Sequence, residues 1–224
     1  MSVQHNLQII KEKIANSCIR GNRKIDDITI IAVTKYSSIE KACEALDAGV
    51  TNLGENRDQE FLHKYEVLKD KPIWHFIGTL QTRKVKNVID KIDYLHSLDR
   101  ISLAEEINKR AASVVNCFIQ VNVSGEESKH GIDPSELMSF LDQLKLYPKV
   151  KIIGLMTMAP NTDDHVLIRN CFRKLKQLQL RVQELNLDYA PCTELSMGMS
   201  NDYEIAIEEG ATMIRIGTAL VGEN

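Results

Sequence analysis

A lysine ends one of the most apolar stretches of the sequence. Residues 28–38, ITIIAVTKYSS, place apolar side chains in near succession before Thr34 and Lys35. Such a run is typical of a strand buried on both faces, and Ser37 and Ser38 then give a helix-start signal. An ammonium group rarely lies at the edge of a core unless it is paired, reaches water or takes part in chemistry. Lys35 is therefore a candidate amine nucleophile, and snorkelling to solvent is the alternative interpretation.

Two segments near the end of the sequence combine glycines with hydroxyl groups. SMGMSND supplies Ser196, Gly198 and Ser200, and RIGTALVGE supplies Gly217 and Thr218. Small residues let backbone N–H groups approach an anion, and barrels often bind phosphate with the loops after their last two strands. These segments therefore predict a phosphate site, with the alternative that the glycines merely allow turns.

An arginine on the last apolar run complements the lysine and the phosphate site. Arg215 alternates with Met213 and Gly217, so strand geometry directs its side chain inward, where it needs an acceptor. An amine, a phosphate site and an inward guanidinium together fit pyridoxal phosphate, which has an aldehyde, a phosphate and a ring nitrogen. Lys35 would form the Schiff base and Arg215 would face the ring nitrogen. A Schiff-base aldolase acting on a phosphosugar shares the first two features but explains the arginine less well.

Short apolar runs alternate along the chain with amphipathic segments that must position these residues. The runs predict eight strands, at 28–34, 51–55, 73–78, 94–99, 117–123, 151–158, 193–197 and 213–217. Helices are predicted between them at 38–49, 57–69, 84–92, 101–112, 134–147, 165–186 and 202–210, after an N-terminal helix with Leu7, Ile10, Ile14 and Cys18 on one stripe.

Strict alternation of strand and helix predicts a parallel sheet, and eight repeats of one unit close a barrel. We therefore predict a single α/β domain over residues 1–224, a (β/α)8 TIM barrel with an extra N-terminal helix. The site would lie at the carboxyl ends of the strands. A doubly wound open sheet is the runner-up, weakened because no G-x-G-x-x-G follows the first strand.

Composition excludes several classes of function. The 28 basic and 31 acidic side chains give a formal charge of −3, with no cluster of basic and aromatic residues for nucleic acid. The five cysteines are scattered without metal-ligand spacing, which favours reduced thiols and no metal site. No run approaches the about 20 apolar residues of a membrane span, and Lys11 to Lys13 interrupt any signal sequence. We predict a cytoplasmic protein without nucleic-acid or membrane partners.

Several segments resemble one known family. AVTK, LGENRDQE, WHFIGTLQTRK, SLDR, IQVNVSGEESKHGI, GLMTM, LSMGMSNDYEIAI and RIGTALVGE resemble the pyridoxal phosphate homeostasis protein family, also called the YggS/PROSC family. The resemblance implies a fold similar to the N-terminal barrel of alanine racemase. It also implies a carrier or regulator of pyridoxal phosphate without an established enzymatic reaction.

The resemblance further implies six cofactor-binding residues. They are Lys35 as the Schiff-base lysine, Asn56 beside the ring, Arg215 at the ring nitrogen, and Ser200, Gly217 and Thr218 around the phosphate. His75 and Lys129 also match motifs of the family, but the sequence assigns them no role.

A pyridoxal phosphate-dependent amino acid racemase is the main alternative, because the same barrel supports one. Two-base racemisation needs an acid/base on each face of the substrate, and in alanine racemase a tyrosine from another domain provides the second. The sequence ends six residues after Thr218, so we expect no such domain. Tyr36 is the nearest tyrosine, but we expect neighbours at a strand end to point apart.

Arg215 bears on the same alternative. A guanidinium keeps its proton, so it favours an unprotonated ring nitrogen and makes the ring a poorer electron sink, although alanine racemase itself uses such an arginine. We therefore predict a non-catalytic, monomeric protein that takes part in homeostasis of pyridoxal phosphate, with apo pyridoxal phosphate enzymes as recipients.

Overall fold

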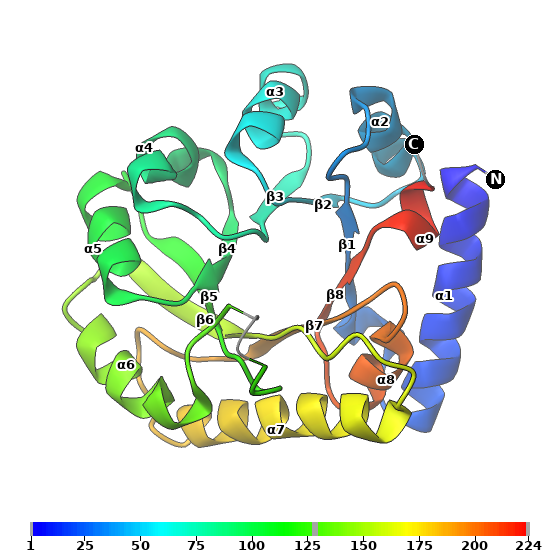
Figure 1. Ribbon diagram of the computed structural model, residues 1–224. Coiled ribbons are helices and arrows are strands. Elements are labelled where there is room, and N and C mark those ends of the chain that lie inside the picture. Colours follow the sequence, from blue (N-terminus) through cyan, green and yellow to red (C-terminus); the bar gives the residue numbers. More distant parts are fainter. Residues whose placement is uncertain (1, 127–129, 223–224) are drawn as a thin grey trace.

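Eight parallel strands close into a barrel inside a ring of helices (Figure 1). The computed structural model describes residues 2–126 and 130–222. The strands are β1 (Thr29–Val33), β2 (Asn52–Glu55), β3 (Ile73–Phe76), β4 (Tyr94–Leu98), β5 (Val115–Gln120), β6 (Val150–Met156), β7 (Glu194–Met199) and β8 (Met213–Ile216). Each strand pairs with the next in sequence, and β8 pairs with β1. The predicted TIM barrel is thereby confirmed, and the open sheet is wrong because it would leave β1 and β8 apart.

The helices follow the predicted alternation. They are α1 (Val3–Arg20), α2 (Ile39–Asp47), α3 (Asp58–Leu68), α4 (Val85–Val88), α5 (Ile101–Arg110), α6 (Leu137–Leu144), α7 (His165–Gln183), α8 (Tyr203–Glu208) and α9 (Thr218–Val221). None of these described helices is long and apolar enough to cross a membrane.

The N-terminal helix α1 completes the helical ring. The Ser2 hydroxyl caps it by accepting from the His5 N–H at 3.3 Å, and the stripe through Leu7, Ile10 and Ile14 is buried. Figure 1 shows α1 alongside α8 and α9. Because α9 has only four residues, α1 covers the part of the wall where a longer helix after β8 would lie.

One predicted helix, 84–92, is broken in the structure. Residues Thr82–Lys84 and Ile89–Lys91 form 3-10 turns on either side of the single α-helical turn α4. β-branched side chains are concentrated here, and they lower helix propensity because their χ1 rotamers are restricted. The short helix α9 was not predicted at all.

Apolar side chains fill two regions, one between the strands and the helices and one inside the barrel. The inner cluster contains Ile31, Phe118, Met156 and Met213. The interior is not purely apolar, because polar side chains from several strands are buried among these residues. They are His75, His96, Ser196 and Arg215, each no more than 4% exposed.

Candidate functional site

The six predicted site residues lie in or just after four neighbouring strands of the barrel, in the order β7, β8, β1 and β2. Ser200 follows β7, Arg215 lies in β8, Gly217 and Thr218 follow β8, Lys35 follows β1, and Asn56 follows β2. The closure of the barrel through β8 and β1 therefore brings the two ends of the sequence to one part of the rim.

Lys35 lies in a tight turn rather than in the strand. The Ser37 N–H donates to the Thr34 carbonyl at 3.0 Å, and Tyr36 at the third position has φ +62°. The Lys35 side chain is exposed, and its Nζ lies 5.9 Å from the centre of the Tyr36 ring. The expectation that these neighbours point apart is wrong, because the turn ends the strand alternation on which it rested. The amine is accessible to a ligand from solvent.

A buried ion pair holds the backbone at the start of this turn. Lys64 Nζ donates to the Thr34 carbonyl at 2.6 Å and to Glu55 Oε1 at 2.7 Å. The Thr34 hydroxyl donates to the same carboxylate oxygen at 2.5 Å. Burial raises the pKa of Glu55, and the charge of Lys64 opposes that rise. The backbone just before Lys35 is thus held by a salt bridge from α3 to β2.

Sequence reasoning missed Lys64. Its spacing from Phe61 and Leu68 places it on the buried stripe of α3, which is an unusual position for a lysine. That helical spacing was the available signal, and it could have been matched with Glu55 at the end of an apolar strand.

Asn56 presents an unsatisfied acceptor. Its Oδ1 is buried and has no hydrogen-bond partner within residues 2–126 and 130–222. The loop after β3 lies directly against the Asn56 backbone, and a side chain at Gly78 would overlap the Asn56 carbonyl. A buried amide oxygen without a partner is costly, so this position favours a ligand that donates a hydrogen bond.

The two glycines of the predicted phosphate site differ. Gly198 has φ +93°, and a Cβ there would lie 2.6 Å from the Cβ of Ala206. The structural alternative accounts for Gly198, because no other residue fits this bend beside α8. At Gly217 a Cβ would meet nothing closer than 3.8 Å. The Gly217 N–H donates to the half-buried Ser200 hydroxyl at 3.3 Å, and Thr218 beside them is exposed.

Arg215 lies inside the barrel, as its alternation predicted, and finds the acceptors that a buried arginine needs. Its Nη1 donates to the Ser196 hydroxyl at 2.6 Å and its Nη2 to the Thr157 carbonyl at 3.0 Å. Burial lowers the pKa of Arg215 to about 10, and Asp202 opposes the shift. The guanidinium therefore remains charged near neutral pH.

His75, whose role the sequence left open, lies in the interior and is hydrogen-bonded to His96 at 2.9 Å. Burial lowers the pKa of His75 to about 3 and that of His96 well below its ordinary value. Sequence reasoning did not select His96, although its alternation with Tyr94 places both on one strand face. Lys129, the other position left without a role, lies outside the described residues.

A surface hollow of about 350 Å³ lies between α2 and α3, lined in part by Tyr36, Glu60 and Lys64. The residues described as lining it include none of the six predicted site residues. This hollow is therefore formed by residues before and at the start of α2 and by residues of α3, rather than by the predicted site residues.

Comparisons with known proteins show the family and the fold of the chain. A family model described as "Alanine racemase, N-terminal domain" matches residues 2–224. The pyridoxal phosphate homeostasis protein of Aquifex aeolicus (strain VF5) is 44% identical, over 100% of this chain and 99% of the relative.

Two solved structures are also similar. PipY of Synechococcus elongatus PCC7942, solved without PLP and with PLP bound, is 33% identical with a TM-score of 0.82, over 95% of this chain and 100% of that chain. Alanine racemase from Corynebacterium glutamicum, at 15% identity, shares the fold with a TM-score of 0.78, over 99% of this chain and 61% of that chain. The chain belongs to the pyridoxal phosphate homeostasis protein family, built on the barrel of the alanine racemase N-terminal domain.

Proposed function

We propose that this protein binds pyridoxal phosphate covalently through Lys35 and acts as a carrier or regulator in its homeostasis. One observation carries the proposal: adjacent strand ends combine an accessible amine, a buried guanidinium and a backbone N–H beside a hydroxyl. The similarity to PipY, solved with PLP bound, supports it.

The residues present fit this cofactor. Arg215 is a buried cation whose N–H groups suit a ring nitrogen, and Asn56 Oδ1 is a buried acceptor without a partner among the described residues. Ser200, Gly217 and Thr218 supply hydroxyls, backbone and open space for the phosphate. Arg215 would therefore face the ring nitrogen, and Ser200, Gly217 and Thr218 would face the phosphate.

When bound, pyridoxal phosphate supplies an electrophilic aldehyde on a ring that can withdraw electrons. Lys35 provides the amine that captures the aldehyde, and its exposure lets another amine compete for it. Arg215 donates a hydrogen bond but does not give up its proton near neutral pH, since its pKa is about 10. The chain therefore favours binding and release over carbanion chemistry.

An amino acid racemase is the second candidate, and the short distance between Lys35 and Tyr36 favours it. However, Tyr36 is 54% exposed and lines the hollow between α2 and α3. Arg215, which marks the proposed ring site, is inside the barrel. An exposed tyrosine beside a hollow that none of the six predicted site residues lines is poorly placed to act as a second base on a substrate at that ring.

Borohydride reduction followed by peptide mass mapping tests the binding site. Purified protein that absorbs in the visible range and carries a pyridoxyl adduct on Lys35 after reduction supports the proposal. A colourless protein, or an adduct only on other lysines, contradicts it.

Exchange of the α-hydrogen of amino acids in deuterium oxide tests the carrier role. Incubation of the holo-protein with each common L-amino acid should give negligible exchange. Turnover on the order of one per second or faster would favour the racemase. A second assay tests delivery to recipients. The holo-protein should reactivate an apo pyridoxal phosphate enzyme, and it should do so more poorly once Lys35 has been reduced onto its cofactor.

The remaining parts of the proposal are a single domain over residues 1–224, a monomeric state and action in the cytoplasm. Light scattering coupled to size-exclusion chromatography tests the monomeric state.

A further inference from the structure

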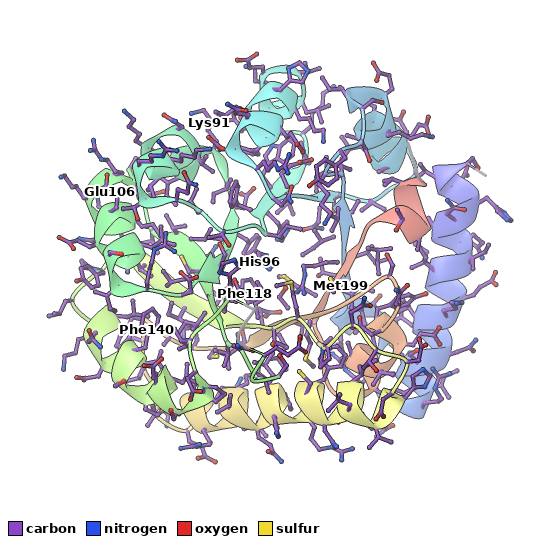
Figure 2. All side chains as sticks on the ribbon, in the orientation of Figure 1. Lys91, His96, Glu106, Phe118, Phe140 and Met199 are labelled. Atoms are coloured by element: carbon purple, nitrogen blue, oxygen red, sulfur yellow. The ribbon has the colours of Figure 1, made fainter. Side chains whose placement is uncertain are left out.

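A chain of hydrogen bonds crosses the barrel interior from the first residue of β2 to Arg215. Asn52 Oδ1 lies 2.8 Å from His75 Nε2, and His75 Nδ1 lies 2.9 Å from His96 Nε2. His96 Nδ1 lies 2.8 Å from the Ser196 hydroxyl, which accepts from Arg215 Nη1 at 2.6 Å. Figure 2 shows His96 with Phe118 near the centre of the barrel. Five strands thus contribute one side chain each to the chain.

The direction of these hydrogen bonds follows from what each group can donate. A guanidinium has no acceptor, so Ser196 Oγ must accept from Arg215. The Ser196 hydroxyl hydrogen then finds His96 Nδ1 within reach. A neutral His96 that accepts at Nδ1 carries its hydrogen on Nε2 and donates to His75 Nδ1. His75 in turn donates from Nε2 to the carbonyl oxygen of Asn52.

The opposite direction leaves groups unsatisfied. If each histidine donated from Nδ1, Ser196 would accept two hydrogen bonds and its own hydrogen would lack an acceptor among residues 2–126 and 130–222. His75 Nε2 and Asn52 Oδ1 would then be two acceptors facing each other. The Asn52 amide is oriented with its Nδ2 donating to the Thr51 hydroxyl at 3.1 Å, which leaves Oδ1 as the acceptor facing His75. The Arg215 end therefore imposes the direction, and the orientation of the Asn52 amide is consistent with it.

The surroundings keep both imidazoles neutral. His75 stacks on Tyr94 at 4.6 Å between ring centres, and His96 stacks on Phe118 at 4.3 Å. Both histidines are fully buried, and the Arg215 cation further opposes protonation of His96. A neutral imidazole has one donor and one acceptor, which is what a relay of fixed direction requires.

We propose that Ser196, His96 and His75 are positioning residues that fix the Arg215 guanidinium through a hydrogen-bond relay running from Arg215 to Asn52. The relay commits the Ser196 hydrogen to His96, so only a lone pair faces Arg215. Arg215 is then anchored at Ser196 and Thr157, with its remaining N–H groups available to an acceptor. This inference deepens the proposed function. It rests on that function only for the identity of the acceptor, which would be the ring nitrogen of the cofactor.

Histidine tautomers in the apo protein provide the first test, which needs no cofactor and no variant. Long-range proton–nitrogen correlation NMR distinguishes protonated from bare ring nitrogens. We expect His75 and His96 to be protonated at Nε2 alone near neutral pH. An imidazolium or an Nδ1–H tautomer at either residue would overturn the relay.

Substitutions at the far end provide the second test. Asn52→Leu removes the terminal acceptor, whereas Asn52→Asp keeps one. We expect Asn52→Leu to change the His96 ring signals and the visible spectrum of bound pyridoxal phosphate, and Asn52→Asp to retain the wild-type His96 tautomer. Ser97→Ala is the matched control, because Ser97 is on β4 beside His96 and its buried hydroxyl has no partner among the described residues.

Ser196→Ala should weaken pyridoxal phosphate binding on the order of tenfold or more, because a hydrogen bond to a charged group is lost. A folded Asn52→Leu protein with unchanged His96 signals and unchanged cofactor spectrum would refute the relay. Wild-type tautomers as expected in a protein that binds no pyridoxal phosphate would support the relay and refute the proposed function instead, so the two failures are distinguishable.

Discussion

The rim turn at Lys35 and the interior around Arg215 present their cations in opposite ways. Lys35 is exposed on a turn with the Tyr36 ring beside its amine, whereas Arg215 is 4% exposed and doubly hydrogen-bonded. A reactive amine must reach incoming and leaving partners, so it gains from accessibility. A group that recognises a ring must stay in place, so it gains from burial and fixed contacts. The proposed site would thus combine an exposed group with an anchored one.

The largest effect is expected at the exposed member of this comparison. Lys35→Ala should abolish the borohydride-fixed pyridoxyl adduct, while the free energy of unfolding changes by less than about 0.5 kcal/mol because the side chain is exposed. Mass spectrometry of the reduced protein and urea titration measure the two quantities. An undiminished adduct, or a large loss of stability, would break the distinction between the two regions.

The buried ion pair between Lys64 and Glu55 should contribute to stability as the contacts of the barrel interior do. Lys64→Ala leaves the buried Glu55 carboxylate and the Thr34 carbonyl without their partner, and should cost about 3–5 kcal/mol in urea unfolding. Lys41→Ala is a matched control, because the exposed pair with Glu44 should contribute less than about 1 kcal/mol.

The pH dependence of Lys64→Ala sharpens this test. Without Lys64, the pKa of Glu55 should rise further in the folded state, above its unfolded value. Protonated Glu55 then stabilises the fold at low pH, and that stability is lost as the pH rises through the folded pKa. The variant should therefore be closer to wild type in acid than at neutral pH, and the reverse trend would contradict this assignment.

Gly198 and Gly217 differ in the space around them, so substitutions at these two positions of the rim should differ in their effect on stability. Gly198→Ala should cost about 1–3 kcal/mol, because a Cβ would crowd Ala206 at a backbone position with φ +93°. Gly217→Ala should change stability by less than about 0.5 kcal/mol, since the space beside it is open. Thermal unfolding of both variants decides this, and equal destabilisation would remove the distinction.

A further prediction concerns the effect of acid on stability through the interior histidines. Their pKa values are lowered in the folded state, so unfolding takes up protons below the ordinary value of 6.5. Stability should be full above that pH and fall by about 1.4 kcal/mol per pH unit for each histidine as the pH decreases, for His75 down to its pKa of about 3. Urea midpoints in wild type and His75→Gln measure this slope, which should be shallower in the variant.

Much of this architecture follows from the sequence by itself. The alternation of apolar runs and amphipathic segments determined eight strands and the helices between them, because strand and helix periodicities are properties of the local backbone. The same period of two directed Arg215 inward. The residues proposed to bind the cofactor were selected by chemistry and by family resemblance, and their roles stay predictions.

Other features were decided only by the tertiary structure. Pairing of β8 with β1 brings Lys35 and Arg215 to neighbouring strands although they are far apart in sequence. The contact between His96 and Ser196 joins residues 100 positions apart, and Lys64 meets Glu55 from a different element. Local periodicity predicts on which face of a strand or helix a side chain lies, but not which other side chains it contacts there. Those meetings depend on barrel closure and strand register, which only the assembled sheet fixes.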